Sequence, residues 1–271
     1  LSKEKAFEPM TLLESGRTRA TVKIQDGCDN FCSYCLIPYL RGRIRSKAPD
    51  DIIAEVENLV EKGYKEIVLT GIHLDSYGKD LDGLSLCDVL ERLDQIDGLC
   101  RIRLGSLEPC FITDETVARM KNLRCLCHQF HLSLQSGSAK ILKLMRRRYT
   151  PAEYEVAVWK LREAFCDVAV TTDIIVGFPG EDPADFNDSF SFAESMELAK
   201  IHVFPYSVRE GTAAAGFPNR VSPKEIAERA EKMNELAKYL EYRFLQRQLG
   251  KRRRVLVEKT DGFIFEGHTE N

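Results

Sequence analysis

Short runs of β-branched and aliphatic residues alternate with longer segments whose apolar positions recur at helical spacing. Runs of the first kind are typical of buried strands, and segments of the second kind are typical of amphipathic helices. Strands are predicted at Ala20–Gln25, Glu66–Gly71, Arg101–Ser106, Gln129–Leu134, Ala169–Val176 and Ile201–Tyr206. Helices are predicted at Asp50–Lys62, Ser85–Ile96, Asp114–Asn122, Ala139–Met145, Ala152–Ala164 and Pro183–Met196.

This alternation of strands and helices favours an α/β fold with a parallel sheet and right-handed crossovers. Six strand–helix units are fewer than a closed barrel of this type contains. We therefore expect a six-unit partial barrel that is open on one side. A flat, doubly wound sheet fits the same periodicity and remains an alternative.

The pattern changes after Val221, where one long charged helix is predicted at Pro223–Leu249 with an apolar face that packs on the core. Two short strands then flank Asp261 and Gly262, which together are a hairpin turn signal. This hairpin resembles the beginning of a small β domain. The predicted domains are 1–221 for the partial barrel, 222–250 for the long helix and 251–271 for the start of the β domain.

Composition describes an ordinary folded protein, with 44% hydrophobic and 30% charged residues in 271. Apolar runs are too short for a membrane span, and the start LSKEKAFEPM lacks the apolar block of a secretory signal. We therefore expect a cytoplasmic protein with no membrane partner. The chain does not begin with Met and ends inside a strand pattern, which indicates a fragment of a longer protein.

The chain has nine cysteines, an odd number without a secretion signal, which favours reduced thiols over disulfides. Three of them, Cys28, Cys32 and Cys35, are clustered directly after the first predicted strand. The others are interpreted as buried small hydrophobes: Cys87, Cys100, Cys110, Cys125, Cys127 and Cys166.

Three clustered thiols raise the question of what they hold. A structural zinc site needs four ligands, which His73 or His131 could complete from a distance. Three thiolates also suit a 4Fe-4S cluster in which one iron has no protein ligand and is open for chemistry.

The spacing Cys-x3-Cys-x2-Cys, with Tyr34 before the third cysteine, resembles the cluster loop of the radical S-adenosylmethionine (SAM) superfamily. Nearly the whole chain is similar to the radical SAM methylthiotransferases, through GYKEIVLTGIHLDSYGKDL, RLGSLEP, HLSLQSGS, MRRRYT, TTDIIVGFPGE and HVFPYSVREGT in that order. The segment GIHLDSYG most resembles the enzymes that act on N6-threonylcarbamoyladenosine beside the anticodon of tRNA. Ser133 stands where the family usually has proline.

The resemblance implies a transferase with a six-unit partial barrel. Cys28, Cys32 and Cys35 would bind a 4Fe-4S cluster whose free iron chelates SAM. A 5′-deoxyadenosyl radical would then remove hydrogen from C2 of the modified adenine, and a second SAM would supply the methyl group. The family also carries an upstream domain with a second 4Fe-4S cluster, which this sequence lacks.

The family further implies partners and a terminal domain. The partners would be the tRNA anticodon loop and a low-potential electron donor such as a flavodoxin or ferredoxin. The terminal hairpin is similar to the start of a TRAM domain, an RNA-binding β-barrel.

Residues at the carboxyl ends of the predicted strands are candidate cofactor ligands, because parallel-barrel enzymes carry their sites there. By match to the family, the candidates for contact with SAM are Tyr34, Gly71, Ser106, Glu108, Gln135, Arg147, Asp173, Ile175 and Gly177. The alternation in the fourth strand also predicts a polar row at His131, Ser133 and Gln135, of which His131 fits an internal hydrogen-bond network best.

The net charge of −3 provides no global attraction to nucleic acid, so any RNA contact must be local. Basic runs occur at Arg41–Arg45, Arg146–Arg148 and Lys251–Arg254, and the first two lie near the predicted site. Arg146 and Arg148 are interpreted as a solvated face. The candidate substrate residues are Arg41, Arg43, Arg45, His73, Tyr206 and Arg209.

Two other functions stay open at this point. One is a methylthiotransferase for isopentenyladenosine in tRNA or for a ribosomal protein. The other is a non-catalytic RNA-binding module that a metal stabilises.

Overall fold

The computed structural model describes residue 7 and residues 18–271. The amino-terminal segment examined for a secretory signal therefore lies, except for residue 7, outside the described residues. No helix in the described part of the chain has both the length and the apolar character needed to cross a membrane.

Every predicted helix is present, and so are five of the six predicted strands, with boundaries that differ by a few residues. The barrel strands are β1 (Arg19–Lys23), β4 (Glu66–Thr70), β5 (Arg101–Leu104), β6 (Ser106–Leu107), β7 (Gln129–Leu132), β8 (Ala169–Val176) and β9 (Lys200–Pro205). The predicted strand Arg101–Ser106 is instead two strands, β5 and β6, which pair in different groups. The helices between them are α2 (Pro49–Glu61), α3 (Leu86–Leu93), α4 (Asp114–Lys121), α5 (Ala139–Leu144), α6 (Pro151–Ala164) and α7 (Pro183–Ser195). Capping boxes at Ser85, Thr113, Thr150 and Asp182 explain where four of these helices begin.

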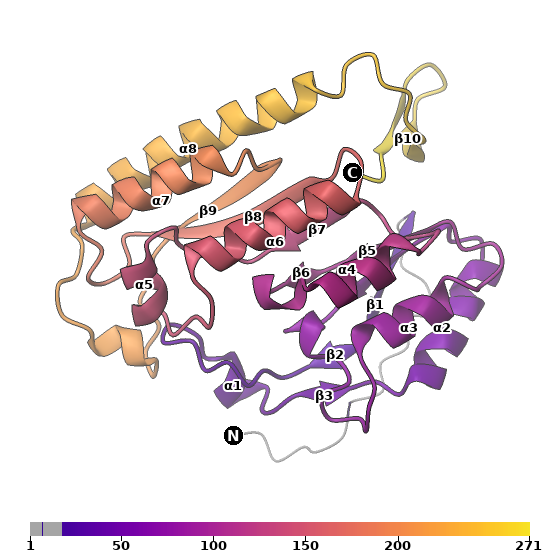
Figure 1. The fold of residues 1–271 in the computed structure, drawn as a ribbon, viewed down its shortest axis with the longest axis horizontal. Helices are drawn as coiled ribbons and strands as arrows, with labels where there is room; N and C mark the ends of the chain where they lie inside the picture. The colour runs from indigo at the N-terminus through magenta and orange to yellow at the C-terminus, as the bar shows by residue number, and fades with distance from the viewer. Residues whose placement is uncertain (1–6, 8–17) are drawn as a thin grey trace.

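Sheet topology decides between the two expected architectures. The strands pair in parallel in the orders β1-β4-β5 and β6-β7-β8-β9, and a parallel bridge between Ile102 and Leu126 connects the two groups. The strand order follows the chain without the reversal that defines a doubly wound sheet. Within the described residues no pairing joins β1 to β9, so the barrel is open between them. The partial barrel is confirmed (Figure 1).

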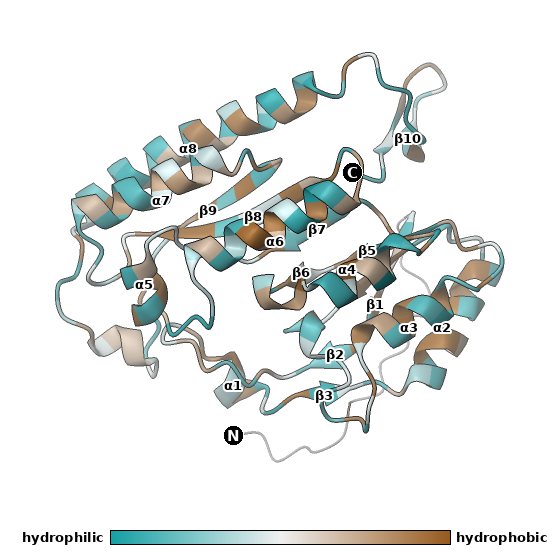
Figure 2. Ribbon diagram, viewed as in Figure 1, coloured by the Kyte–Doolittle hydropathy of each residue, from teal (hydrophilic) through white to brown (hydrophobic). Residues whose placement is uncertain are grey.

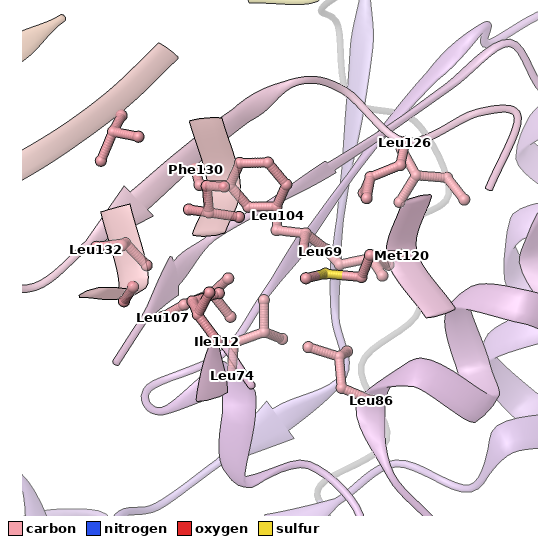
Figure 3. Packing of buried hydrophobic residues seen from close by; sticks show 14 of the residues in the cluster. Leu69, Leu74, Leu86, Leu104, Leu107, Ile112, Met120, Leu126, Phe130 and Leu132 are labelled. Carbon is pink, nitrogen blue, oxygen red and sulfur yellow. The ribbon is translucent and has the colours of Figure 1, made fainter. Parts of the chain in front are cut away.

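The hydrophobic core lies between the strands and the helices that cover them. Figure 2 shows apolar and polar residues alternating along these helices, as an amphipathic helix requires. In Figure 3, Leu69, Leu104 and Phe130 from the strands lie close to Leu86 and Met120 from α3 and α4, and each is at most 3% exposed.

Because side chains alternate along a strand, those that do not face the helices point into the barrel interior. In β8, Thr172 and Ile174 are fully buried toward the helices, whereas Thr171 and Asp173 are only partly buried. His131 in β7 faces the same interior, with Nδ1 at 3.1 Å from Thr171 Oγ1 and Nε2 at 3.4 Å from Asp173 Oδ2. The barrel interior is therefore polar, and His131 belongs to the hydrogen-bond network that was expected.

After the barrel, helix α8 (Pro223–Gln246) packs along β9 and α7, as Figure 1 shows. Its buried face consists of Arg229, Ala230, Met233, Leu236, Ala237 and Leu240, so the predicted packing of an apolar face on the core is confirmed. The terminal hairpin joins β10 (Leu256–Thr260) to β11 (Phe265–His268) in antiparallel pairing. Asp261 Oδ1 accepts from the backbone N–H groups of Phe263 and Ile264, so the connecting loop is longer than a two-residue turn.

A buried carboxylate fixes this hairpin to the barrel. Glu66, at the first residue of β4, is 0% exposed and lies 2.9 Å from Arg103 Nε, 3.5 Å from Arg101 Nη1 and 3.7 Å from Arg19 Nη1. Arg101 donates to the carbonyls of Arg254 (2.7 Å) and His268 (2.9 Å), and Arg103 donates to that of Thr269 (3.0 Å). The hairpin is therefore held at the amino ends of the strands. Figure 1 shows β10 at the opposite end of the molecule from α1.

The basic run at Lys251–Arg254 is partly used in the same region. Lys251 and Arg253 both pair with the carboxylate of Asp167. Arg254 is exposed and has only a long contact of 3.9 Å with Glu270. This run therefore contributes to the attachment of the hairpin and offers less free charge to RNA than its sequence indicates.

We predict that Glu66→Ala destabilises the protein by about 3–5 kcal/mol, because it leaves the charges of Arg101 and Arg103 buried without a counterion. The measurement is the free energy of unfolding in urea. Glu163→Ala, an exposed carboxylate on α6, is the matched control and should change it by less than about 0.5 kcal/mol. Equal stability of the two variants would contradict a structural role for Glu66.

Candidate functional site

The three clustered cysteines lie on one loop that a small ladder closes at its base. Strand β2 (Gln25–Asp26) pairs in antiparallel fashion with β3 (Arg45–Ser46), and the intervening residues form the loop. Gly27 has a φ of +73°, and a Cβ on it would lie 1.9 Å from the carbonyl oxygen of Arg43. The loop therefore needs glycine where it leaves the sheet. The three cysteines precede the short helix α1 (Ile37–Leu40), which lies within the same loop.

Each of the three sulfur atoms accepts a hydrogen bond from nitrogen. The donors are Asn30 N to Cys28 Sγ, Arg147 Nη1 to Cys32 Sγ and Ile37 N to Cys35 Sγ, each at 3.4 Å. Donors of this kind favour the thiolate over the thiol. All three side chains are partly buried and none forms a disulfide.

Burial and the neighbouring sulfurs oppose the ionisation of this group. Burial raises the pKa of the Cys35 thiol, and the nearby Cys32 and Cys28 add to the increase. Three adjacent thiolates repel one another unless a metal ion compensates their charge.

Behind the loop lies a buried ion pair between Arg147 and Glu108. Arg147 Nη2 is 2.8 Å from Glu108 Oε1, and the two side chains are 7% and 8% exposed. Arg147 Nε donates to Tyr149 Oη at 2.9 Å, and Asn30 Nδ2 donates to Glu108 Oε1 at 2.8 Å. Burial acts to raise the pKa of Glu108, but a hydrogen bond from His73 and the charge of Arg147 outweigh it and hold the pKa below its usual value.

His73 lies beside this pair at the end of β4. Its Nε2 is 3.3 Å from Asp75 Oδ2 and 3.7 Å from Glu108 Oε2. Burial acts to lower the pKa of His73, but hydrogen bonds with Asp75, Cys28 and Glu108 raise it to about 12. The imidazole is therefore charged at neutral pH. His73, Asp75 and Glu108 have ligand atoms within 4.8 Å of one another, yet the charges of His73 and Arg147 already compensate the two carboxylates without a metal ion.

A hollow of about 470 Å³ opens next to the cysteine loop at the carboxyl ends of β8 and β9. Five of the predicted residues line it together: Tyr34, Cys35, Ile175, Tyr206 and Arg209. Leu36, Leu40, Phe204 and Pro205 also line it, so much of the wall is apolar. Burial raises the pKa of Tyr34, which keeps its hydroxyl neutral. We call this space the mouth hollow.

Gln135 and Asp173 lie at the same end of the barrel. Gln135 has a φ of +67°, its N–H donates to the carbonyl of Asp173, and its own carbonyl accepts from Ile175 N. A non-glycine residue in this conformation is uncommon and marks a specialised backbone position. The arrangement places the Gln135 side chain where the strand pairing ends.

The structure gives packing reasons for two glycines that were predicted to contact SAM. A Cβ on Gly177, whose φ is +76°, would lie 2.4 Å from Ile226 Cγ1 in α8. A Cβ on Gly71 would lie 2.8 Å from Gln25 Cβ. Ser106 is exposed in β6 and forms none of the contacts described above. Contact of these three residues with SAM remains a prediction.

The three arginines after the loop differ in their surroundings. Arg45 is 5% exposed, lies 3.4 Å from Asp26 Oδ2 and donates to the carbonyl of Arg41 at 2.8 Å. Its guanidinium therefore holds the base of the loop. Arg41 is exposed, and Arg43 lies near Asp29 and over the ring of Phe31 with its side chain 65% exposed. Arg41 and Arg43, rather than Arg45, present positive charge at the surface.

Sequence reasoning missed several members of this site. Asn30, Asp75 and Tyr149 contribute hydrogen bonds to it, but none was singled out. Asn30 lies between Cys28 and Cys32, and Asp75 lies in the segment GIHLDSYG. Their positions within these motifs were the signal that could have identified them. Tyr149 follows an arginine run that drew attention to charge instead.

Comparison with known proteins identifies the family. A family model described as the radical SAM superfamily matches residues 22–193. The chain belongs to this superfamily. The radical SAM chain is 42% identical, over 94% of its length, to a protein of Chlamydia pneumoniae named threonylcarbamoyladenosine tRNA methylthiotransferase MtaB, of which it covers 60%. It is also 42% identical, over 92% of its length, to a tRNA-2-methylthio-N(6)-dimethylallyladenosine synthase of Caldicellulosiruptor saccharolyticus, of which it covers 54%.

Solved structures agree on the fold of this radical SAM chain. The methyltransferase TsrM of Kitasatospora setae has a TM-score of 0.61 at 15% identity, with 72% of this chain and 36% of that chain covered. Coproporphyrinogen III oxidase of Escherichia coli has a TM-score of 0.60 at 14% identity, with 83% and 53% covered. The chain spans little more than half the length of the curated relatives above.

The superfamily implies a 4Fe-4S cluster and SAM, and the cysteine loop fits the first of these. It offers three sulfur ligands on one short loop, each supported by an N–H donor, together with a mutual repulsion that bound iron would relieve. Four protein ligands, which a structural zinc site requires, are not gathered here among the described residues.

We predict that Cys28→Ala, Cys32→Ala or Cys35→Ala each abolishes cluster binding, because two thiolates cannot hold four irons. The measurement is iron and sulfide content after anaerobic reconstitution. Of the six cysteines predicted to be buried, Cys87, Cys125 and Cys127 are buried, but the prediction is wrong for Cys100, Cys110 and Cys166, which are exposed. Cys166→Ala, which removes an exposed thiol far from the loop in the sequence, is the control and should bind iron like the wild type. A loop variant that retains wild-type iron would overturn the ligand assignment.

Proposed function

We propose that the protein methylthiolates C2 of N6-threonylcarbamoyladenosine next to the anticodon of tRNA. Cys28, Cys32 and Cys35 hold a 4Fe-4S cluster, and SAM binds in the mouth hollow. The observation that carries this proposal is the position of the three-thiolate loop beside that hollow, at the carboxyl ends of the strands where barrel enzymes carry out their chemistry. When bound, the cluster supplies the electron that cleaves SAM reductively.

The chain's own residues bind and enclose the reactants. Tyr34 and Ile175 line the mouth hollow and exclude water from the radical. Arg147 and Glu108 fix the position of Cys32 and Asn30 and so preserve the geometry of the loop. Gln135 and Asp173 offer polar groups from the barrel interior to SAM.

The proposed RNA substrate is an unstacked base of a single-stranded loop, which suits an open hollow better than a duplex does. Arg209 lines the mouth hollow, Arg41 and Arg43 are exposed shortly after the three cysteines of the loop, and all three provide contacts for RNA phosphates. A low-potential flavodoxin or ferredoxin delivers the electron. A second 4Fe-4S cluster, on a domain outside this sequence, takes part in sulfur insertion.

Isopentenyladenosine is the second candidate substrate, because relatives named for either substrate are 42% identical to this chain. Overall similarity therefore does not discriminate between them. The preference for threonylcarbamoyladenosine rests on the segment GIHLDSYG, whose His73 and Asp75 lie at the site, 3.3 Å apart.

A ribosomal protein side chain would require a peptide to enter the hollow. A non-catalytic, metal-stabilised RNA-binding module would bind tRNA without using SAM. SAM cleavage separates an enzyme from the binding module, and methylthiolation of two RNAs separates the two tRNA substrates.

We predict that the reconstituted and reduced protein converts SAM into 5′-deoxyadenosine and methionine slowly in the absence of RNA, because the cluster loop and the mouth hollow are both present in this chain. Liquid chromatography measures both products. Cys32→Ala is the control and should produce neither. Without 5′-deoxyadenosine above that control, the enzymatic proposal fails and the binding module remains.

A second prediction concerns the substrate. The full-length protein, supplied with anticodon-loop RNAs that carry either threonylcarbamoyladenosine or isopentenyladenosine, should add a methylthio group to the first in preference to the second. The reason is that an exposed cation pairs with the threonyl carboxylate, whereas an isopentenyl group needs an apolar pocket. Mass spectrometry detects the addition. Preference for the isopentenyl RNA, or equal use of both, would refute the substrate while leaving the radical chemistry intact.

A further inference from the structure

A second, smaller hollow lies on the other flank of the cysteine loop. It has a volume of about 280 Å³ and is lined by Asp29, Asn30, Ile44, His73, Lys79, Asp80 and Arg148. Its walls come from the loop between Cys28 and Cys32, from the segment that follows β4 and from the end of the arginine run. Among its lining residues only Ile44 is aliphatic, and the other six are charged or polar. We call this space the flank hollow.

The carboxylates in the flank hollow are already engaged. Asp80 accepts hydrogen bonds from Ser46 N at 2.8 Å and from Ser46 Oγ at 2.6 Å, one on each oxygen. Asp29 Oδ1 lies 3.4 Å from Arg43 Nη1, an arginine outside the hollow. Both acids therefore serve to hold the surrounding loop.

The cations in the flank hollow are not compensated in the same way. Within the part of the chain that the structure describes, neither Lys79 nor Arg148 has a carboxylate partner at ion-pair distance. Arg148 uses Nη2 to donate to the carbonyl of Asp29 at 3.0 Å, which orients the guanidinium and leaves its other N–H groups available. Both side chains belong to exposed residues. Lys79 and Arg148, on the wall of one hollow, form a site for a carboxylate.

The position of the flank hollow relates it to the reaction. Asn30 lines it, and the same residue donates from its backbone to Cys28 Sγ and from its side chain to Glu108. Asp29 and Asn30, which line the hollow, lie in the chain between the predicted cluster ligands Cys28 and Cys32. In adenine, C2 and C6 are both bonded to N1, so a group on N6 lies within the length of a side chain from the carbon that reacts.

We propose that the flank hollow binds the threonyl carboxylate of the N6-threonylcarbamoyl group, with Lys79 and Arg148 as its ligands. The proposal rests on the proposed function and gives it a specificity site. Lys79 directly follows the segment GIHLDSYG. The segment that indicated the substrate therefore lies next to a cation that would bind the carboxylate of that substrate. An isopentenyl group in the same space would separate both cations from water without giving them a partner.

The test measures RNA binding by the full-length protein without relying on turnover. Fluorescence anisotropy compares three anticodon stem-loop RNAs that differ only in the base beside the anticodon: threonylcarbamoyladenosine, isopentenyladenosine or adenosine. Wild-type protein should bind the first most tightly. In Lys79→Gln/Arg148→Gln, affinity for that RNA should fall by about tenfold or more relative to the other two, because charge-assisted hydrogen bonds are lost.

Controls separate this outcome from a general effect. Arg146→Gln removes an exposed arginine that does not line the hollow and should leave the preference unchanged. Lys79→Arg/Arg148→Lys keeps both charges and should retain most of the preference, which guards against a double variant that fails to fold. Thermal unfolding of each variant checks that it is folded.

Two results would overturn the proposal. Equal weakening of all three RNAs by the double glutamine variant would show that Lys79 and Arg148 contact RNA phosphates instead of the modification. An unchanged preference in that variant would show that the carboxylate is bound elsewhere. In both cases wild-type methylthiolation of the threonylcarbamoyl RNA would still support the proposed function, whereas wild-type protein that never acts on this RNA would refute the function itself.

Discussion

The ion pair between Arg147 and Glu108 is the interaction on which the arrangement of the site depends. It connects the segment after α5 with the end of β6, and through Cys32 and Asn30 it reaches two points of the cysteine loop. Burial of two charges costs several kcal/mol per ion, and here the hydrogen bond from Arg147 to Tyr149, the hydrogen bond from Asn30 to Glu108 and the neighbouring His73 offset that cost. A loop with almost no regular structure thus acquires a defined position from side chains of distant elements.

The cost of burying charge also explains why the core is apolar and the barrel interior is polar. Outward positions of the strands pack against helices and are apolar, whereas inward positions such as His131 and Asp173 are polar and pair with each other. An interior of this kind remains accessible to polar ligands at its mouth. The opposite pole, where the strands begin, is occupied by Glu66, its arginines and the terminal hairpin.

Local patterns explain what the sequence could predict. Strand and helix positions follow from periodicity over a few residues, and the cluster ligands follow from the spacing of Cys28, Cys32 and Cys35. The partners of buried charges could not be predicted, because Glu108 lies 39 positions before Arg147 in the chain and no local pattern relates the two.

The arginines that follow the three cysteines also show that the sequence does not reveal which charges are buried. Arg41, Arg43 and Arg45 look equivalent in the sequence, yet only Arg45 reaches Asp26 and is buried. Gly177 shows a second limit of prediction from the sequence. The requirement for glycine at this position could be predicted, but the residue that would clash with a side chain there, Ile226, belongs to a helix far along the chain.

The way the hairpin is attached has a consequence for how this region tolerates mutation. On the hairpin's side, the hydrogen bonds from Arg101 and Arg103 are accepted by the backbone carbonyls of Arg254, His268 and Thr269. Every amino acid has such a carbonyl. On the barrel's side the donors are specific guanidinium groups. The carbonyl contacts therefore tolerate wide sequence drift in the hairpin, whereas Glu258, Lys251 and Arg253, which pair through their side chains, and the barrel's arginines and Glu66 have less freedom to vary. A different β segment of similar backbone shape could be joined to the same pole.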